Sequence, residues 1–268
     1  MTSNNPFIEH IKSHRSVREY LPQEVSEEVL QEILEAGVRA SSSGNMQAFS
    51  IIVTKDPDIK AELSPLHFNQ PMVDEAPALL TFCADFNRMR KWLKLSKAPE
   101  NFDNFMSFMI AAIDATLASQ NCALAAEAHG LGVCYMGTTL ANAHLIGPVL
   151  GLPKNVIPIV GFSLGYPKST PNKKDRLPLD SLVHYDRYED YKDEEIKELY
   201  SKREVDGMRR YRNVPRLKKM IEESDVENLA QVYTKIKYTR ESHLTYSNNL
   251  LNYLKEQEFF VNDNGSTL

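Results

Sequence analysis

Cysteine is scarce in this sequence, and its spacing excludes the common cysteine motifs. The three cysteines, Cys83, Cys122 and Cys134, are an odd number and no two have the C-x-x-C spacing. Nothing at the N-terminus has the pattern of a signal peptide, so we expect the reducing cytoplasm as the compartment. None of the three has an activating base in view, and each is expected to be a small core residue.

A surplus of positive charge is also missing. The chain has 31 lysines and arginines against 36 aspartates and glutamates, a formal net charge of -5. General affinity for nucleic acids depends on clustered cations that neutralise phosphates, so this balance argues against a nucleic-acid partner. Any basic site must therefore be local.

No long hydrophobic run is free of polar residues. The longest, Phe105 to Leu131, contains Asp114, Gln120 and Glu127, which favours a buried helix over a membrane span. At 268 residues and 42% hydrophobic, the chain can bury a large core as one domain, or as a domain with an extension. We expect no membrane partner.

Two chemical motifs lack the context that they need. His10 and His14 have the i,i+4 spacing of helical zinc ligands, but no glutamate follows His10 and no third ligand is evident, so we predict no metal. The run from Gly161 to Gly165 matches the G-x-S-x-G nucleophile elbow of serine hydrolases. An elbow must open into a helix, whereas Tyr166 and Pro167 follow here, and no HGGG-type oxyanion loop precedes it.

A dinucleotide-binding motif is incomplete as well. Gly130 and Gly132 begin a G-x-G-x-x-G pattern, but Tyr135 stands at its third glycine. These glycines also precede a predicted strand instead of following it, so a Rossmann-type nicotinamide site is not expected.

What the sequence does contain is a dense polar cluster near its start, with an imidazole, a hydroxyl and two guanidiniums within five residues. A helix that begins at Pro6 and is stopped by Pro22 would place His14 one turn from Arg18, and Arg15 three residues from Arg18. These cations could then converge on one oxyanion, such as a phosphate. The alternative is that they only complement the helix dipole.

Strands and helices alternate along the first part of the chain. Ser26 is a good N-cap for a helix that ends at Ala40, and a long alanine-rich helix is expected over 104–129. The apolar, partly β-branched runs predict strands at 49–53, 78–83, 133–136 and 156–164. This order favours an α/β or α+β sandwich over 1–186, with a polar, mostly helical extension over 187–268.

Three loops or segments have compositions that suit ligand binding. The run from Ser41 to Asn45 exposes small polar side chains, although a flexible turn would look the same. The Lys174-Asp175-Arg176 loop could add two cations to the first cluster, or could be a solvated loop. The basic stretch from Lys202 to Lys219 suggests a second phosphate site, with a solvated helix face as the alternative.

Together, several stretches resemble the FMN-dependent nitroreductase family, in particular its NADPH-dependent flavin and nitro reductase branch. The resemblance covers roughly residues 5 to 190 and is collective. It lies in the following stretches: His14–Arg18 (the N-terminal FMN motif), Ala40–Ser43 (the serine loop), Gln70 (beside the isoalloxazine), Cys83–Arg88 (a strand end), Gly130–Gly137 (the flavin-lining segment) and Lys174–Pro178 (the phosphate loop).

This resemblance implies a fold and an assembly. The fold would be α+β, an α/β sandwich with a mixed, mainly antiparallel sheet of four to five strands flanked by helices. The protein would be a domain-swapped homodimer with two FMN sites, each built from both subunits, and the serine loop would come from the partner. The extension over 187–268 would pack on the dimer and border the nicotinamide site.

The resemblance also implies an activity and its residues. NADPH would reduce bound FMN, and a nitro compound, quinone, flavin or similar small molecule would then take two electrons in the same pocket, a ping-pong mechanism without a catalytic protein residue. Arg15 would stabilise negative charge near N1 and O2 of the reduced flavin. The residues implied in FMN binding are His14, Arg15, Ser16, Arg18, Ser42, Gln70, Tyr135, Met136, Gly137, Lys174 and Arg176, and those suggested for NADPH are Arg203 and Arg210.

Two other functions remain open from the sequence. One is a flavin-destroying or dehalogenating enzyme of the same fold, and the other is a flavin-binding regulatory protein without turnover. The chain also departs from the family at Asn45, where an apolar or aromatic residue is common, and at Thr138, where a second glycine is common.

Overall fold

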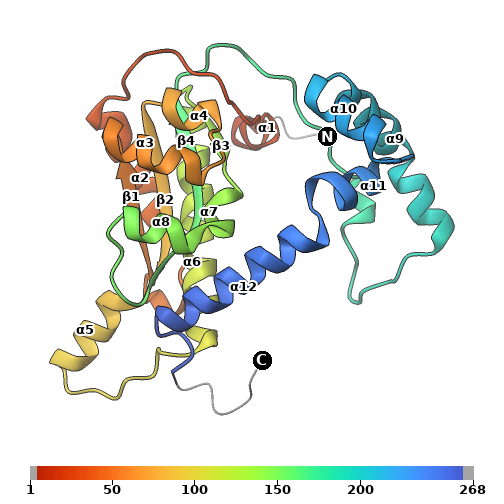
Figure 1. Cartoon of the computed structure of the whole chain (residues 1–268). Coiled ribbons are helices and arrows are strands. Elements are labelled where there is room, and N and C mark those ends of the chain that lie inside the picture. Colours follow the sequence, from red (N-terminus) through yellow and green to blue (C-terminus); the bar gives the residue numbers. More distant parts are fainter. Residues whose placement is uncertain (1–4, 262–268) are drawn as a thin grey trace. The chain divides into compact units, whose positions relative to one another are not determined.

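The computed structural model describes residues 5–261 and divides the chain into two compact units (Figure 1). Lys174–Thr245 form the second unit, and the rest of the described chain forms the first. Helix α12 (Arg240–Glu256) begins in the second unit and ends in the first. The division after residue 186 that the sequence suggests concerns function, a flavin-binding core and its extension, and it stays a prediction.

The elements of the first unit follow the predicted alternation of helices and strands. Besides the C-terminal part of α12 they are α1 (Pro6–Lys12), α2 (Glu27–Val38), η1 (Ser43–Asn45), β1 (Phe49–Thr54), α3 (Pro57–Leu66), α4 (Pro71–Glu75), β2 (Ala78–Asp85), α5 (Asn87–Leu95), α6 (Phe105–Ala128), β3 (Gly132–Tyr135), α7 (Thr138–Ala141), α8 (Ala143–Val149) and β4 (Val156–Gly165).

The four predicted strands form one antiparallel sheet in the order β1-β2-β4-β3. Every residue of β2 is buried, as expected for a strand with a neighbour on each side and a covered sheet on both faces. Strands β1 and β3 are the edges. The predicted α+β sandwich with a mainly antiparallel sheet is therefore confirmed.

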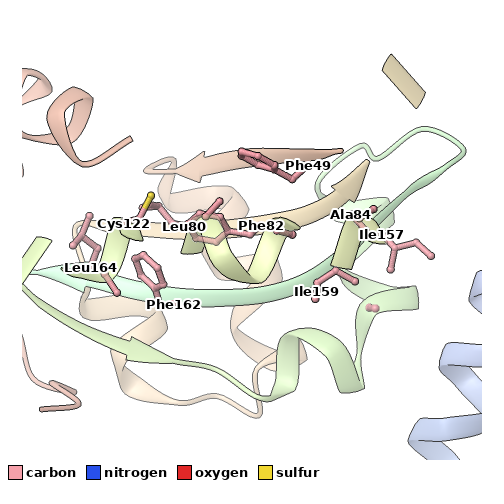
Figure 2. Close-up of a cluster of buried hydrophobic side chains, with 14 of the residues drawn as sticks. Phe49, Leu80, Phe82, Ala84, Cys122, Ile157, Ile159, Phe162 and Leu164 are labelled. Carbon is pink, nitrogen blue, oxygen red and sulfur yellow. The ribbon is translucent and has the colours of Figure 1, made fainter. Parts of the chain in front are cut away.

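Side chains of the sheet alternate between two hydrophobic clusters, one on each face. In β2, Leu80 and Phe82 face a cluster that includes α2 and α6, whereas Leu79 belongs to the other cluster, with residues of α3, α4 and α8. Figure 2 shows the first cluster, in which Leu80 and Phe82 lie near Phe162. The helices thus cover both faces of the sheet.

In β4, a β-bulge interrupts the regular alternation of side chains between the two faces of the sheet. Ile157 and Ile159 face the first cluster, and so does Phe162, which is three residues further on. The pairing register between β2 and β4 shifts at Phe82, where one residue of β4 is left without a partner. This extra residue lets both halves of a ten-residue strand present apolar side chains to the same helices.

The predicted alanine-rich helix is α6, and it lies against α2 and the sheet (Figure 1). By length and hydropathy it could cross a membrane, and it is the one such helix among residues 5–261. Alanines along α6 are fully buried, and a Cβ added at Gly37 of α2 would lie 2.2 Å from the Cys122 Sγ. Small residues therefore let the two helices approach closely.

All three cysteines are free and buried, as expected for core residues. Burial raises the pKa of the Cys83 and Cys122 thiols to about 12 and also raises that of Cys134. Neutral thiols of this kind are poor nucleophiles.

The second unit is mainly helical and has its own small core. Its elements besides the start of α12 are η2 (Leu179–Ser181), α9 (Asp193–Arg212), α10 (Pro215–Glu223), α11 (Leu229–Gln231) and the π-helical turn η3 (Val232–Lys237). Leu229 packs so closely on Gly207 of α9 that an added Cβ there would lie 2.5 Å from a Leu229 methyl. The predicted helical character of this region is confirmed.

One local expectation was wrong, and one helix was not predicted. Helix α1 ends at Lys12, ten residues before Pro22, because the next residues pair with the sheet instead of continuing the helix. The sequence also did not predict α5, which projects its exposed Trp92 and Leu95.

Candidate functional site

The polar cluster at residues 14–18 lies in an extended segment along the outer edge of β3. The Val17 N–H donates to the Val133 carbonyl at 2.9 Å, and Ser16 forms a parallel bridge with Val133. A Cβ added at Gly132 would lie 2.4 Å from a Val17 methyl, so glycine allows this close contact. The predicted helix that would bring His14 within one turn of Arg18 is therefore wrong, because residues four apart in an extended segment share a side but lie about 13 Å apart.

Tyr20 fixes the end of this segment to the sheet. Its hydroxyl lies 2.8 Å from both the Val17 carbonyl and the Ser163 Oγ, and its burial raises its pKa. Ser163 is fully buried inside β4 and does not stand on a turn before a helix. The G-x-S-x-G match is thus a strand, and the argument against a serine hydrolase is confirmed.

His14 and Arg15 of this segment are partly buried, and each has a ring or guanidinium nitrogen that can bind a further group. His14 Nδ1 lies 2.6 Å from a carboxylate oxygen of Glu127 on α6, and because a carboxylate only accepts, Nδ1 donates and Nε2 stays available. The Arg15 Nε is buried and has no hydrogen-bond partner in the described part of the chain. Arg18 is exposed. An orphaned buried guanidinium nitrogen indicates that an acceptor from outside the chain belongs there.

Three further candidate residues, Tyr135, Met136 and Gly137, lie at the end of β3 and just after it. Met136 is buried and its N–H donates to the Gly161 carbonyl at 2.8 Å, while the Tyr135 hydroxyl donates to Ser119 on α6. Burial raises the pKa of Tyr135 to about 12. Gly137 faces open space, because a Cβ added there would meet no atom within 4 Å.

Gln70 is connected through His67 to Thr138, which follows Gly137 in the chain. The Gln70 amide donates to the His67 carbonyl at 2.9 Å, and His67 Nδ1 lies 2.7 Å from the hydroxyl of Thr138, the residue after Gly137. Burial lowers the pKa of His67 to about 4, so the ring is neutral at pH 7. Phe68 and Asn69 between them are left-handed, a backbone that needs such support.

The serine loop, residues 41–45, has its hydrogen bonds with α6 instead. The Ser42 hydroxyl donates to the Asp114 carboxylate at 2.7 Å and accepts from the Gln47 N–H at 2.7 Å. The Ser43 N–H also donates to Asp114, at 3.0 Å. This loop is therefore held by a buried carboxylate.

The remaining predicted site residues belong to the second unit. Lys174 and Arg176 are exposed and flank Asp175, whose carboxylate lies 3.0 Å from Arg203 Nε and 4.0 Å from Arg210 Nη1. The hydrogen bond from Arg203 lowers the pKa of Asp175. Both cations suggested for the nicotinamide nucleotide thus meet one carboxylate of the basic loop.

Taken together, the first unit brings the 14–18 segment, the end of β3 and the Gln70 loop onto neighbouring elements. These elements offer the unpaired Arg15 Nε, the His14 ring and the open space at Gly137. Such groups fit a planar, anionic ligand rich in hydrogen-bond acceptors, such as a flavin nucleotide. Among residues 5–261, no group of three or more His, Cys, Asp or Glu side chains could hold a metal ion.

Comparison with known proteins identifies the family. The model of the nitroreductase family matches residues 11–166. The chain is 38% identical over 186 residues to an FMN reductase (NADPH) of Bacillus subtilis, covering 69% of this chain and 75% of the relative. It is 34% identical over 204 residues to an oxygen-insensitive NADPH nitroreductase of Salmonella typhimurium, covering 73% and 83%.

The chain belongs to the nitroreductase family. A crystal structure of a Bacteroides fragilis protein described as an oxidoreductase superposes with a TM-score of 0.85 at 41% identity, over 94% of this chain and 99% of that one. The family resemblance that the sequence shows is therefore confirmed, together with the fold.

Three residues that support the candidate site were not predicted from the sequence. Asp114 was visible as a lone carboxylate in an alanine-rich run, but which loop it meets depends on how α6 packs. Glu127 and His67 carried no local signal, because their partners His14 and Thr138 lie 113 and 71 residues away.

The two departures from the family pattern have visible consequences. Thr138, where a second glycine is common, uses its hydroxyl to bind His67. Asn45 is exposed and left-handed, with φ of 55°, a conformation that asparagine tolerates better than most residues. The loop conformation and residue type agree at this position.

Proposed function

We propose that this chain is an NADPH-dependent, FMN-carrying oxidoreductase that reduces small acceptors such as nitro compounds, quinones and flavins. The names of its relatives support the cofactor, the reductant and the reaction. The observation that carries the proposal in this structure is the Arg15 Nε, a buried donor without a partner in the described part of the chain, on the segment that pairs with β3. When bound, FMN supplies the redox chemistry, taking a hydride at N5 and passing two electrons to the second substrate.

The protein residues then bind, orient and stabilise. Arg15 places its positive charge where the reduced flavin gains negative charge near N1 and O2. His14 is oriented by Glu127 through Nδ1, and its imidazolium form would donate from Nε2 to the phosphate, with Arg18 and Ser16 on the same side of the extended segment.

The isoalloxazine is proposed to lie against the end of β3 and the Gln70 loop. Tyr135, Met136 and Gly137 would hold the ring, and Gln70 would border it. No protein group needs to act as acid or nucleophile, so these residues determine position and access only. NADPH and the acceptor use the same open face in turn, which makes the mechanism ping-pong.

Lys174 and Arg176 are proposed to bind phosphate, and Arg203 and Arg210 are proposed for the NADPH 2′-phosphate. The contacts of both arginines with Asp175 support a shared position for them. A 2′-phosphate, like this carboxylate, has several charged oxygens that can accept from the two guanidiniums. It would therefore have to replace Asp175 as their partner or bind beside it. The preference for NADPH would follow from these two cations.

We further propose a cytoplasmic, domain-swapped homodimer in which the serine loop meets the partner's FMN. Helix α6 supports this, because an apolar stripe at helical spacing stays exposed on its outer side. The stripe consists of Met106, Met109, Ile113 and Leu117. Exposed apolar patches of this kind mark protein interfaces.

The proposal is tested by the absorption spectrum and by steady-state kinetics. The purified protein should show flavin bands, and it should oxidise NADPH faster than NADH with nitrofurazone, a quinone or FMN as acceptor. A protein that stays colourless after soaking with FMN would refute the proposal. A yellow protein that oxidises neither nucleotide with any acceptor would instead be a flavin-binding regulator.

A further inference from the structure

A single carboxylate inside α6 organises the serine loop. Asp114 is 1% exposed, in a helix whose other buried residues are mostly alanine. Its oxygens accept from the Ser42 hydroxyl, from the Ser43 N–H and from the Ala48 N–H, the last at 3.3 Å. A buried charge needs such hydrogen bonds, and here the loop and Ala48 just after it supply every one that the structure shows.

The backbone between these contacts is strained. Gly44, Asn45 and Gln47 have φ of 55°, 55° and 52°, in the left-handed region. Residues other than glycine persist there only where their surroundings hold them. Asp114 binds the chain on both sides of the strained stretch, at Ser43 before it and at Ala48 after it.

We infer that Asp114 is a positioning residue that holds the serine loop in the shape that grips the FMN phosphate of the partner's site. This deepens the proposed function and rests on it. Ser42 then acts through two groups: its hydroxyl anchors the loop on Asp114, and its backbone N–H remains as a donor. Neither that N–H nor the Ser43 hydroxyl has a hydrogen-bond partner within the described residues.

The Ser42 N–H and the Ser43 hydroxyl suit a ligand that has hydrogen-bond acceptors. A phosphate monoester offers several charged acceptor oxygens, whereas the ribityl chain and the ring can bind elsewhere in the site. Asp114 therefore contributes to affinity for FMN and little to affinity for riboflavin, which lacks the phosphate. The ratio of the two affinities separates this role from a general effect on folding.

The test compares Asp114→Asn with the wild type. The side chain keeps its size, but its amide N–H₂ now faces N–H and O–H donors of the loop. Titration by quenching of flavin fluorescence should show an FMN Kd about tenfold higher or more, the effect of losing one charged hydrogen bond, and a riboflavin Kd changed by less than about twofold. Ser42→Ala, which removes one hydrogen bond to Asp114 from a partly buried side chain, is expected to show the same pattern.

Phe108→Leu is the matched control on the same helix, since Phe108 is buried in the core, where its ring packs against Phe105 and Phe259. It should leave both flavin affinities unchanged. Equal weakening of FMN and riboflavin in Asp114→Asn and Ser42→Ala, or no weakening, would overturn the inference. Failure of the wild type to bind FMN would refute the proposed function itself, which keeps the two results apart.

Discussion

At the scale of single residues, the Arg15 side chain has the clearest consequence. Its buried Nε lacks an acceptor within the described chain, so this nitrogen adds little to the stability of the folded protein without cofactor. Arg15→Ala should therefore leave the stability of the flavin-free protein nearly unchanged, while the FMN Kd rises about tenfold or more. Calorimetry and flavin titration measure the two quantities.

The control for this change is Lys12→Ala, which removes an exposed cation from α1 with only a surface ion pair to Glu9. It should alter neither quantity. Unchanged FMN affinity and turnover in Arg15→Ala would contradict the role assigned to the guanidinium.

His67 makes stability depend on pH. Its pKa is about 4 in the folded protein and near 6.5 when unfolded, because burial disfavours the charged ring. Between these values the unfolded chain binds a proton that the folded one does not. Stability is therefore complete above pH 6.5 and falls as the pH drops towards 4, by roughly 3 kcal/mol at most.

Urea unfolding from pH 7.5 to pH 4.5 would measure this loss. His67→Gln should be less stable at pH 7.5, having lost the contact with Thr138, but its stability should fall less with pH. His129→Gln, at a partly exposed histidine paired with Glu32, is the control and should keep the wild-type slope. Identical slopes in the wild type and His67→Gln would refute this account.

At the scale of elements, the first residue of β3 and the N-cap of α7 are two glycines with opposite requirements. At Gly132 an added methyl would collide with Val17 and push the 14–18 segment off the strand. At Gly137 it would meet nothing within 4 Å, and φ of -61° suits alanine. One glycine serves the fold, and the other leaves room for the proposed flavin.

The two alanine variants should therefore differ. Gly132→Ala should lower the free energy of unfolding by about 1–3 kcal/mol, as overpacking does, and weaken FMN binding with it. Gly137→Ala should keep or slightly raise stability and still weaken FMN binding. Denaturant unfolding and flavin titration decide, and unimpaired FMN binding in Gly137→Ala would place the flavin elsewhere.

At the scale of the whole molecule, the exposed stripe on α6 predicts the assembly. Ile113, at its centre, is 51% exposed, and in the proposed dimer it would be buried. Ile113→Glu should convert the dimer to monomers and remove most of the bound FMN, because each site needs the partner's serine loop. Light scattering after size exclusion reports the mass, and the absorption spectrum reports the flavin.

Leu145→Glu is the control, since Leu145 is 45% exposed on α8, against the opposite face of the sheet. It should remain a flavin-bound dimer. A wild type that is monomeric yet yellow would rule out the shared site.

The sequence by itself determined the elements and the family. Strand and helix periodicity placed the four strands, α2 and α6 to within a few residues, because those patterns reflect burial along a single element. The collective motifs indicated a flavin-binding nitroreductase, which the family match confirms. The G-x-S-x-G run could be dismissed from its neighbours alone.

Only the tertiary structure decided how the site residues are held. Residues 14–18 are extended because β3 offers its free edge, a pairing partner more than a hundred residues away. Asp114, Glu127 and His67 support the site for the same reason, since each bonds to a residue that packing alone brings near. Local propensity carries no information about such contacts, because their energy exists only once the sheet and α6 have come together.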